Sequence, residues 1–197
     1  MPTPQDVYET HFGWTGRSTR KAVTNAVGAL TGLVAIAIGV LVRGAAGLVL
    51  VTLGVLALLT AGASLAVTAA AVRGRRTALR VDREGILLGG HPLRYEGTSA
   101  LVPWGDIVGV ELWVRRTGAM SYVGLHRIEG APDLPATTTN PKTLQAAERA
   151  AGRPIALVTA SRPIHLWELD VRQLLNTIAR YAPQAVITVD PAFPGGA

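Results

Sequence analysis

Two long uncharged segments constrain the fold of this chain more than any other feature. Ala22–Val42 has 21 residues without a charge, and after Arg43 the 29 residues Gly44–Val72 have none either. A helix crosses the hydrocarbon core of a bilayer, about 30 Å thick, with roughly 20 apolar residues. The sequence therefore predicts a transmembrane helical hairpin in residues 22–72, and its two helices and turn are placed at 22–42, 46–72 and 43–45.

Basic residues flank this hairpin and predict its orientation. Arg17, Arg20 and Lys21 precede the first span, and the residues that follow the second span are Arg73, Arg75, Arg76 and Arg80. Lys and Arg beside a span stay on the cytoplasmic side of the membrane. Both termini are therefore predicted to be cytoplasmic, in a multi-pass protein of the inner (cell) membrane. A cleaved signal peptide fits less well, because the first apolar run is too long and a second span follows.

The distribution of charge bears on the partners of the chain. The formal net charge is +6, of which residues 1–76 carry +5 and residues 77–197 carry +1. A nucleic-acid-binding domain collects Lys and Arg on its folded body, so nucleic acid is not expected as a partner. Seventeen Arg against two Lys is typical of a GC-rich bacterial genome.

The arginines after the second span have two interpretations. Arg73, Arg75, Arg76 and Arg80 either set the topology alone or contact anionic lipid headgroups. Each basic group near an anionic surface gains about 1 kcal/mol. Membrane lipid is therefore an expected partner, and these four residues are the candidate headgroup contacts.

Small residues recur on one face of the first span, at Gly28, Gly32, Ala35 and Gly39. Helices in lipid associate where small residues let their backbones approach. The stripe either packs the two helices of the hairpin together or forms a homodimer through the Gly28/Gly32 face. Neither span holds Asp, Glu, Lys, Arg or His, which argues against transport or proton relay.

Residues 1–21 are interpreted as a separate cytoplasmic segment that lies at the membrane interface. Tyr8, Phe12 and Trp14 occur just before the basic cluster. Aromatic rings with a polar edge settle at the level of the lipid headgroups. The segment is therefore expected to act as a short interfacial anchor.

Residues 73–197 are predicted to form one cytoplasmic, mostly β domain. Alternating apolar residues and turn signals indicate strands at 79–81, 86–88, 99–102, 107–114, 121–128, 155–160, 164–169 and 186–189. An insertion at 129–154 holds a helix at 141–151, which begins after Asn140-Pro141 and ends at Gly152. A late amphipathic helix follows the cap residue Asp170 and ends before Pro183. The number of strands after Ile128 stays open.

The strand at 107–114 places a large aromatic residue opposite the expected core. Val108, Val110, Leu112 and Val114 share one face, while Glu111 and Trp113 point to the other. Trp113 is either covered by the 141–151 helix or belongs to an exposed protein-partner surface with Arg115 and Arg116.

Three stretches resemble the bacterial pleckstrin-homology-like (PH-like) domains of small two-span membrane proteins. They are the hairpin Leu79–Ile86, the proline-tryptophan step Val102–Ile107 and the capped helix Asp170–Ala182. The resemblance covers residues 77–189 and implies a PH-like barrel or sandwich that serves as a membrane-tethered binding or scaffolding module. Phosphoinositide binding is not carried over, because the charges of Arg80, Asp82, Arg83 and Glu84 in the first hairpin nearly cancel.

No catalytic or metal-binding motif accompanies this organisation. The chain has no cysteine, and its histidines, at 11, 91, 126 and 165, show no metal-ligand spacing. No nucleophile elbow or phosphate loop occurs, and Glu111 and Asp106 would form an acid pair only if the fold joined them. We therefore expect a non-enzymatic protein without cofactor or metal that acts through contacts with an unidentified protein. The alternatives are an anionic-lipid or small-ligand sensor and, third, a small-ligand enzyme.

Overall fold

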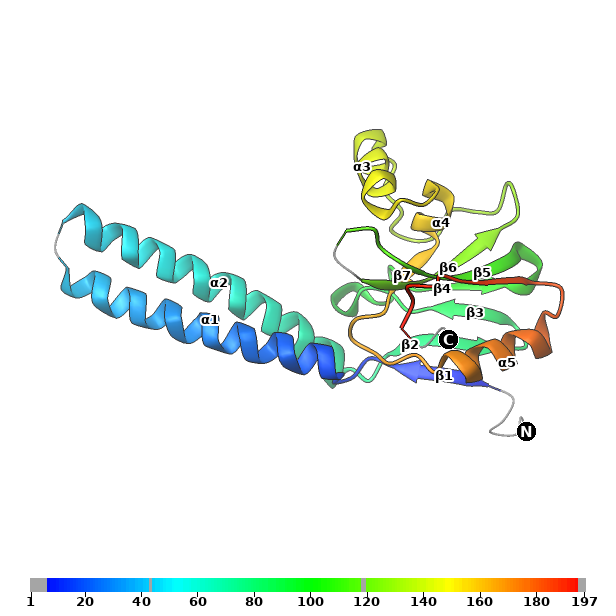
Figure 1. Cartoon of the computed structure of the whole chain (residues 1–197), viewed down its shortest axis with the longest axis horizontal. Coiled ribbons are helices and arrows are strands. Elements are labelled where there is room, and N and C mark those ends of the chain that lie inside the picture. The colour runs from blue at the N-terminus through cyan, green and yellow to red at the C-terminus, as the bar shows by residue number, and fades with distance from the viewer. Residues whose placement is uncertain (1–6, 43, 118–119, 195–197) are drawn as a thin grey trace.

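The computed structural model describes residues 7–42, 44–117 and 120–194, which form a helical hairpin and a β domain (Figure 1). The hairpin projects from one end of the β domain, so that the first helix starts and the second helix ends beside the sheets. The expected combination of an apolar helical pair with a mostly β domain is therefore present.

The hairpin consists of helix α1 (Gly16–Leu41) and helix α2 (Ala45–Arg73). At 1.5 Å per residue these helices are about 39 and 44 Å long, which is enough to cross a bilayer. The stretches long and apolar enough to span a membrane are Ser18–Leu41 and Ala45–Ala70, and only 11% of an 18-residue apolar window in each is buried inside the protein. The expected turn includes Arg43, which lies outside the described residues.

Helix α1 begins earlier than the predicted residue 22. Thr15 caps it, because the Ser18 backbone N–H donates to Thr15 Oγ1 at 3.1 Å and the Thr15 N–H donates to Ser18 Oγ at 2.7 Å. Such a reciprocal pair satisfies two backbone groups that a helix start leaves without partners. The basic residues before the first span are therefore part of the helix itself.

Close backbone contact between the two helices involves glycines of both. A Cβ added to Gly32 would lie 2.8 Å from the Gly54 carbonyl oxygen, and one on Gly39 would lie 2.8 Å from that of Gly47. Gly28 faces open space, with no atom within 4 Å of such a Cβ. Gly32 and Gly39 of the predicted stripe thus pack the hairpin, whereas Gly28 does not take part in that contact. The homodimer through the Gly28/Gly32 face stays a prediction. Ala35 is half-buried on α1.

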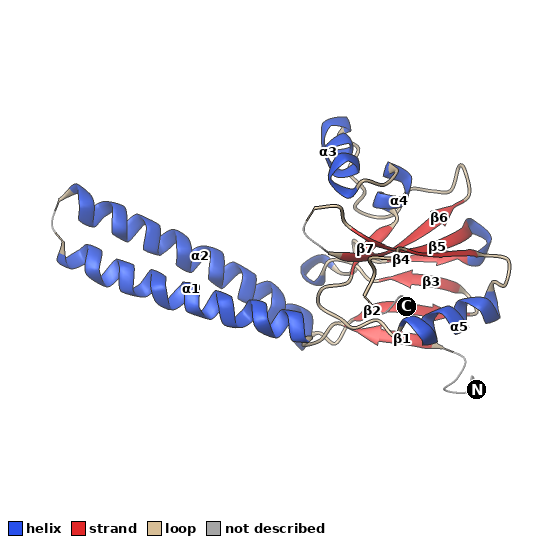
Figure 2. Ribbon diagram, in the orientation of Figure 1, coloured by secondary structure: helices blue, strands red, loops and turns tan. Residues whose placement is uncertain are grey.

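Two four-stranded sheets form the β domain (Figure 2). The first sheet is antiparallel throughout, and its order is β1 (Tyr8–His11), β2 (Thr77–Asp82), β3 (Gly85–Leu88) and β4 (Ala100–Pro103). The order of the second is β7 (Ser161–Pro163), β6 (Ser121–Arg127), β5 (Ile107–Val114) and β8 (Val186–Val189), with β8 parallel to β5.

The chain passes from the first sheet to the second through the predicted proline-tryptophan step. The short helix η2 (Trp104–Asp106) joins β4 to β5, and a similar turn, η1 (Pro92–Arg94), follows β3. The Trp104 indole N–H donates to the Asp82 carbonyl at 2.8 Å, and its ring stacks on Tyr181. Trp104 therefore fixes the corner to the first hairpin and to the last helix.

Helix α5 (Val171–Tyr181) closes the core between the two sheets. The Asp170 carboxylate accepts a hydrogen bond from the Gln173 N–H at 2.9 Å, as the cap signal predicts. Leu174 and Ile178 are fully buried in a core shared with strands of both sheets. Helix α3 (Pro141–Ala151) also has its predicted bounds, between the cap Asn140 and a left-handed Gly152.

The separate interfacial segment predicted for residues 1–21 is wrong in part. Residues 8–11 form β1, which pairs with β2 in the first sheet. Tyr8 and Phe12 are buried in the core, and only Trp14, 53% exposed, keeps the freedom an anchor needs. Four strand residues without a neighbouring turn signal do not reveal a partner that follows about 70 positions later.

Two predicted strands and one predicted core position are also wrong. Residues 155–160 form helix α4 (Ile155–Thr159), because a short apolar run fits a helix as well as a strand. Residues 164–169 cross the domain as a loop, in which Leu166 and Trp167 are both buried and so do not alternate. Val108 is 48% exposed, since the pairing of β5 with β6 shifts register between Ile107 and Gly109.

Candidate binding cavities at the base of the hairpin

The junction between the hairpin and the β domain is tied by backbone hydrogen bonds. The Phe12 N–H donates to the Arg76 carbonyl at 2.9 Å, and the Gly13 N–H donates to the Leu166 carbonyl at 2.8 Å. The segment before α1 is thereby held both to the chain after α2 and to the 164–169 loop. Two neighbouring cavities lie at this junction.

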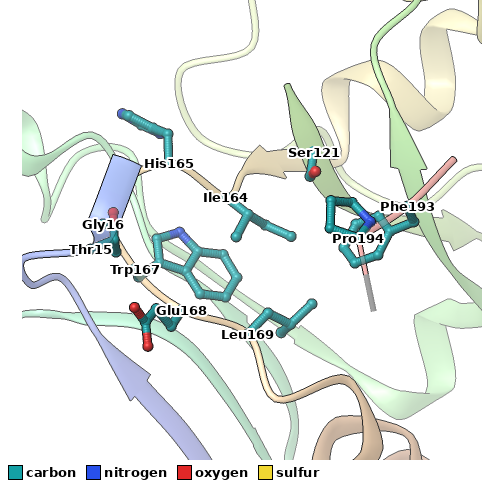
Figure 3. A pocket seen from close by; sticks show the side chains of 10 residues that line it. All are labelled: Thr15, Gly16, Ser121, Ile164, His165, Trp167, Glu168, Leu169, Phe193 and Pro194. Atoms are coloured by element: carbon teal, nitrogen blue, oxygen red, sulfur yellow. The ribbon is translucent and has the colours of Figure 1, made fainter. Parts of the chain in front are cut away.

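The larger cavity has a volume of about 520 Å³ and a mainly apolar lining (Figure 3). Its wall is formed by the loop residues Ile164, Trp167 and Leu169 and by Phe193 near the end of the described chain. Figure 3 shows Ile164 and Leu169 directed toward the same space as Phe193, while the His165 ring points away. Thr15, Ser121 and Glu168 supply polar groups at its edge.

The second cavity, of about 290 Å³, lies between helix α2 and the sheets. Val67 lines it from the helix, and Gly89, Gly90 and Pro92 line it from the segment after β3. Strand β7 contributes Arg162. The two cavities share His165 and Trp167, so the 164–169 loop separates them.

Arg162 is the charged group that distinguishes the second cavity. Its guanidinium donates three hydrogen bonds to backbone carbonyls, from Nε to Gly89 at 3.1 Å, from Nη1 to Ser161 at 3.0 Å and from Nη2 to Thr98 at 3.0 Å. Burial lowers the pKa of Arg162, because removal from water disfavours the charged form. Arginine stays protonated in proteins nonetheless, so the cavity holds a fixed positive charge.

Sequence reasoning did not single out Arg162 as a site residue. The sequence shows only a lone cation between two apolar runs, 155–160 and 164–169, both of which are predicted as strands. Because neither forms a strand at those bounds, the register that would have placed Arg162 inside the domain could not be derived.

The four predicted headgroup contacts are not equivalent. Arg73 and Arg75 are exposed at the end of α2, close to the hairpin base. Arg76 lies over the Tyr95 ring, with its guanidinium carbon 5.2 Å from the ring centre, and donates to the Pro92 carbonyl at 3.4 Å. Arg80 lies within β2, where its Nε is 2.8 Å from Asp82 Oδ2. The structure therefore groups three of the four at the junction and pairs the fourth within its own strand.

The predicted partner surface around Trp113 does not form. Trp113 is 1% exposed, stacks on Tyr122 with ring centres 4.4 Å apart, and packs against Ala151 and Leu157. Its indole N–H donates to Ser161 Oγ at 3.1 Å. The alternative interpretation, in which the insertion covers Trp113, is the correct one, and α4 shares that role with α3. Arg115 and Arg116 are left without the aromatic group expected to join them.

Glu111 and Asp106 do not form an acid pair. The Glu111 carboxylate is 2.8 Å from His126 Nε2 and 3.1 Å from Arg153 Nε, and Arg153 also contacts Asp190 at 2.8 Å. Asp106 lies 3.9 Å from an Arg127 nitrogen instead. The Glu111 network ties β5 to β6 and to the end of β8, and neither Glu111 nor His126 lines the cavities described above.

The part of the chain that the structure describes also lacks a cluster of metal ligands. There, no three His, Asp or Glu side chains gather as metal ligands. The expectations of no cofactor and no metal stay predictions. The chain matches no model of a known protein family, no curated protein and no solved structure.

Proposed function

We propose that this protein is a PH-like binding module held against the cytoplasmic face of the cell membrane by its helical hairpin. The observation that carries the proposal is the common exit of both helices from one end of the β domain. Two helices of this length and apolarity, with most of their surface unburied, are suited to lipid. The junction and its cavities then lie at the headgroup level.

Binding is favoured over catalysis by the composition of the cavities. Their walls are mainly apolar with a few polar groups, which is typical of ligand sites. The short contact between His126 and Glu111, 2.8 Å, lies away from both cavities. A ligand site at the junction therefore has more support than the protein-contact surface expected around Trp113, which is buried.

The topology can be tested by single-cysteine labelling, since the chain contains no cysteine of its own. We expect Ala46→Cys, at the exposed start of α2, to react with a membrane-impermeant maleimide added to intact cells. Thr143→Cys, exposed on α3, should react only after the membrane is permeabilised. Two spans with cytoplasmic termini require this pattern.

The two positions serve as controls for each other, because both side chains are exposed in the folded protein. Labelling of Thr143→Cys in intact cells, or recovery of the chain in the soluble fraction after lysis, would refute the proposed anchoring.

A further inference from the structure

Arg162 carries a positive charge with no carboxylate beside it among the described residues. Elsewhere in the β domain, Arg80, Arg127 and Arg153 each have a carboxylate within 4.0 Å. Among the described residues, Arg162 has none, and its three acceptors are neutral carbonyls. Arg162 is partly buried, and removal of a charge from water without an opposite charge beside it is costly. An anion in the cavity would remove that cost.

The guanidinium also has donors left for a ligand. Arginine carries five N–H groups, of which three point to carbonyls of the described chain. The three bonds fix the orientation of the guanidinium plane, so little side-chain entropy remains to be lost on binding. A fixed fork of N–H donors suits the oxygens of a phosphate group.

The volume and the position of the cavity further limit the class of ligand that it can bind. A volume of about 290 Å³ fits a headgroup or a small phosphate compound rather than a lipid tail. Val67 lines the cavity from within the last turn of the apolar stretch that ends at Ala70. Arg76 reaches Pro92 on the cavity wall and adds a second cation nearby.

We propose that this cavity binds a phosphate group through Arg162. The phosphate belongs either to an anionic lipid headgroup or to a soluble phosphate compound, because both present the same oxygens. The lipid source rests on the proposed membrane anchoring, whereas the phosphate site itself does not. The ligand would be held by Arg162 of β7 and not by the charged residues of the first hairpin, although Ala78 of β2 also lines the cavity.

The test is native mass spectrometry of the full chain, purified in a neutral detergent. The probes are vesicles of phosphatidylcholine alone, vesicles of phosphatidylcholine with phosphatidylglycerol, and inorganic phosphate. We expect the unmodified chain to retain phosphatidylglycerol in preference to phosphatidylcholine, or to retain inorganic phosphate. Competition between the two probes identifies a single site, and the stronger competitor identifies the source.

Two variants test the site in different ways. Arg162→Gln removes the charge, and Val67→Phe fills the cavity from α2 while it leaves the three guanidinium hydrogen bonds in place. Arg162→Gln is expected to weaken retention about tenfold, the effect of losing a charge-assisted interaction. Val67→Phe is expected to weaken it by at least as much, because the larger side chain takes the space of the ligand. Arg172→Gln is the matched control, because Arg172 is exposed on α5 and does not line the cavity.

Several outcomes would overturn the proposal. One is retention of neither probe above the phosphatidylcholine background, and another is unchanged retention in Val67→Phe. If Arg162→Gln fails to fold, as judged by tryptophan emission, Val67→Phe decides alone. If the chain retains phosphate but cysteine labelling does not show two spans, only the proposed anchoring is refuted. If labelling shows the expected topology but neither probe is retained, only the phosphate site is refuted.

Discussion

At the scale of single residues, some polar groups of the β domain join elements that lie far apart in the sequence. Tyr8 illustrates this, because its hydroxyl accepts a hydrogen bond from the Asp170 N–H at 3.1 Å. Burial raises the pKa of Tyr8 above the usual value of 10.0, because removal from water disfavours the charged phenolate. The hydroxyl thereby joins β1 to the start of α5, two elements at opposite ends of the chain.

Trp113 offers a prediction at this scale. Trp113→Ala is expected to lower the free energy of unfolding by about 3–5 kcal/mol, because it empties a buried space under α3 and α4. Trp14→Ala, at a site 53% exposed, should change it by less than about 0.5 kcal/mol. Chemical denaturation of the full chain in detergent measures both. Equal stability of the two variants would mean that the insertion does not cover Trp113.

At the scale of elements, the hairpin depends on backbone contact between its two helices. The Asn25 side chain donates to Ser64 Oγ at 2.7 Å across the pair, near the β domain. Farther along, glycines of α1 meet glycines of α2. This arrangement leaves the larger apolar side chains to face outward.

A cysteine pair can report on this contact. Asn25→Cys with Ser64→Cys should form a disulfide on mild oxidation, because the two side chains touch and the chain supplies no competing thiol. Adding Gly32→Ile should slow disulfide formation several-fold, since a Cβ there meets the Gly54 carbonyl. Gly28→Ile is the matched control and should have little effect, as open space surrounds that position. A similar effect of both substitutions would contradict the observed face.

Elements with strong local signals were predictable from the sequence, and elements defined by distant partners were not. The helix at 141–151 carries its own start and stop residues, and the strand at 107–114 is long, with apolar residues at alternate positions of its sequence. By contrast, β1 has four residues and is held by a partner beyond the hairpin. The candidate cavity depends on such distant contacts. The carbonyls that hold the Arg162 guanidinium belong to Gly89 and Thr98, in the segment between β3 and β4.

At the scale of the whole molecule, the hairpin is inserted between two neighbouring strands of one sheet. Strand β1 precedes α1, and its partner β2 follows α2. The β domain is therefore not contained in residues 73–197, contrary to the division expected from the apolar segments. It needs the residues that come before the hairpin as well.

This arrangement can be tested by replacing the hairpin. Residues 73–197 alone are expected to aggregate, because they lack Tyr8 and Phe12 of the core and expose the unpaired edge of β2. Residues 7–15 joined to them through a short flexible linker should restore a monomer with a cooperative unfolding transition. Size-exclusion chromatography and thermal unfolding measure the difference. A stable monomer of residues 73–197 would show that β1 is dispensable.

The position of the hairpin within the sheet has a consequence for biogenesis. Given the proposed anchoring, β1 leaves the ribosome before the hairpin and cannot pair until both spans have been inserted and β2 has emerged on the same side. A nascent chain that crossed the bilayer only once would leave the two strands in separate compartments, where no sheet can close. Folding of the β domain thus depends on correct membrane insertion, and only chains with both spans in place complete the first sheet.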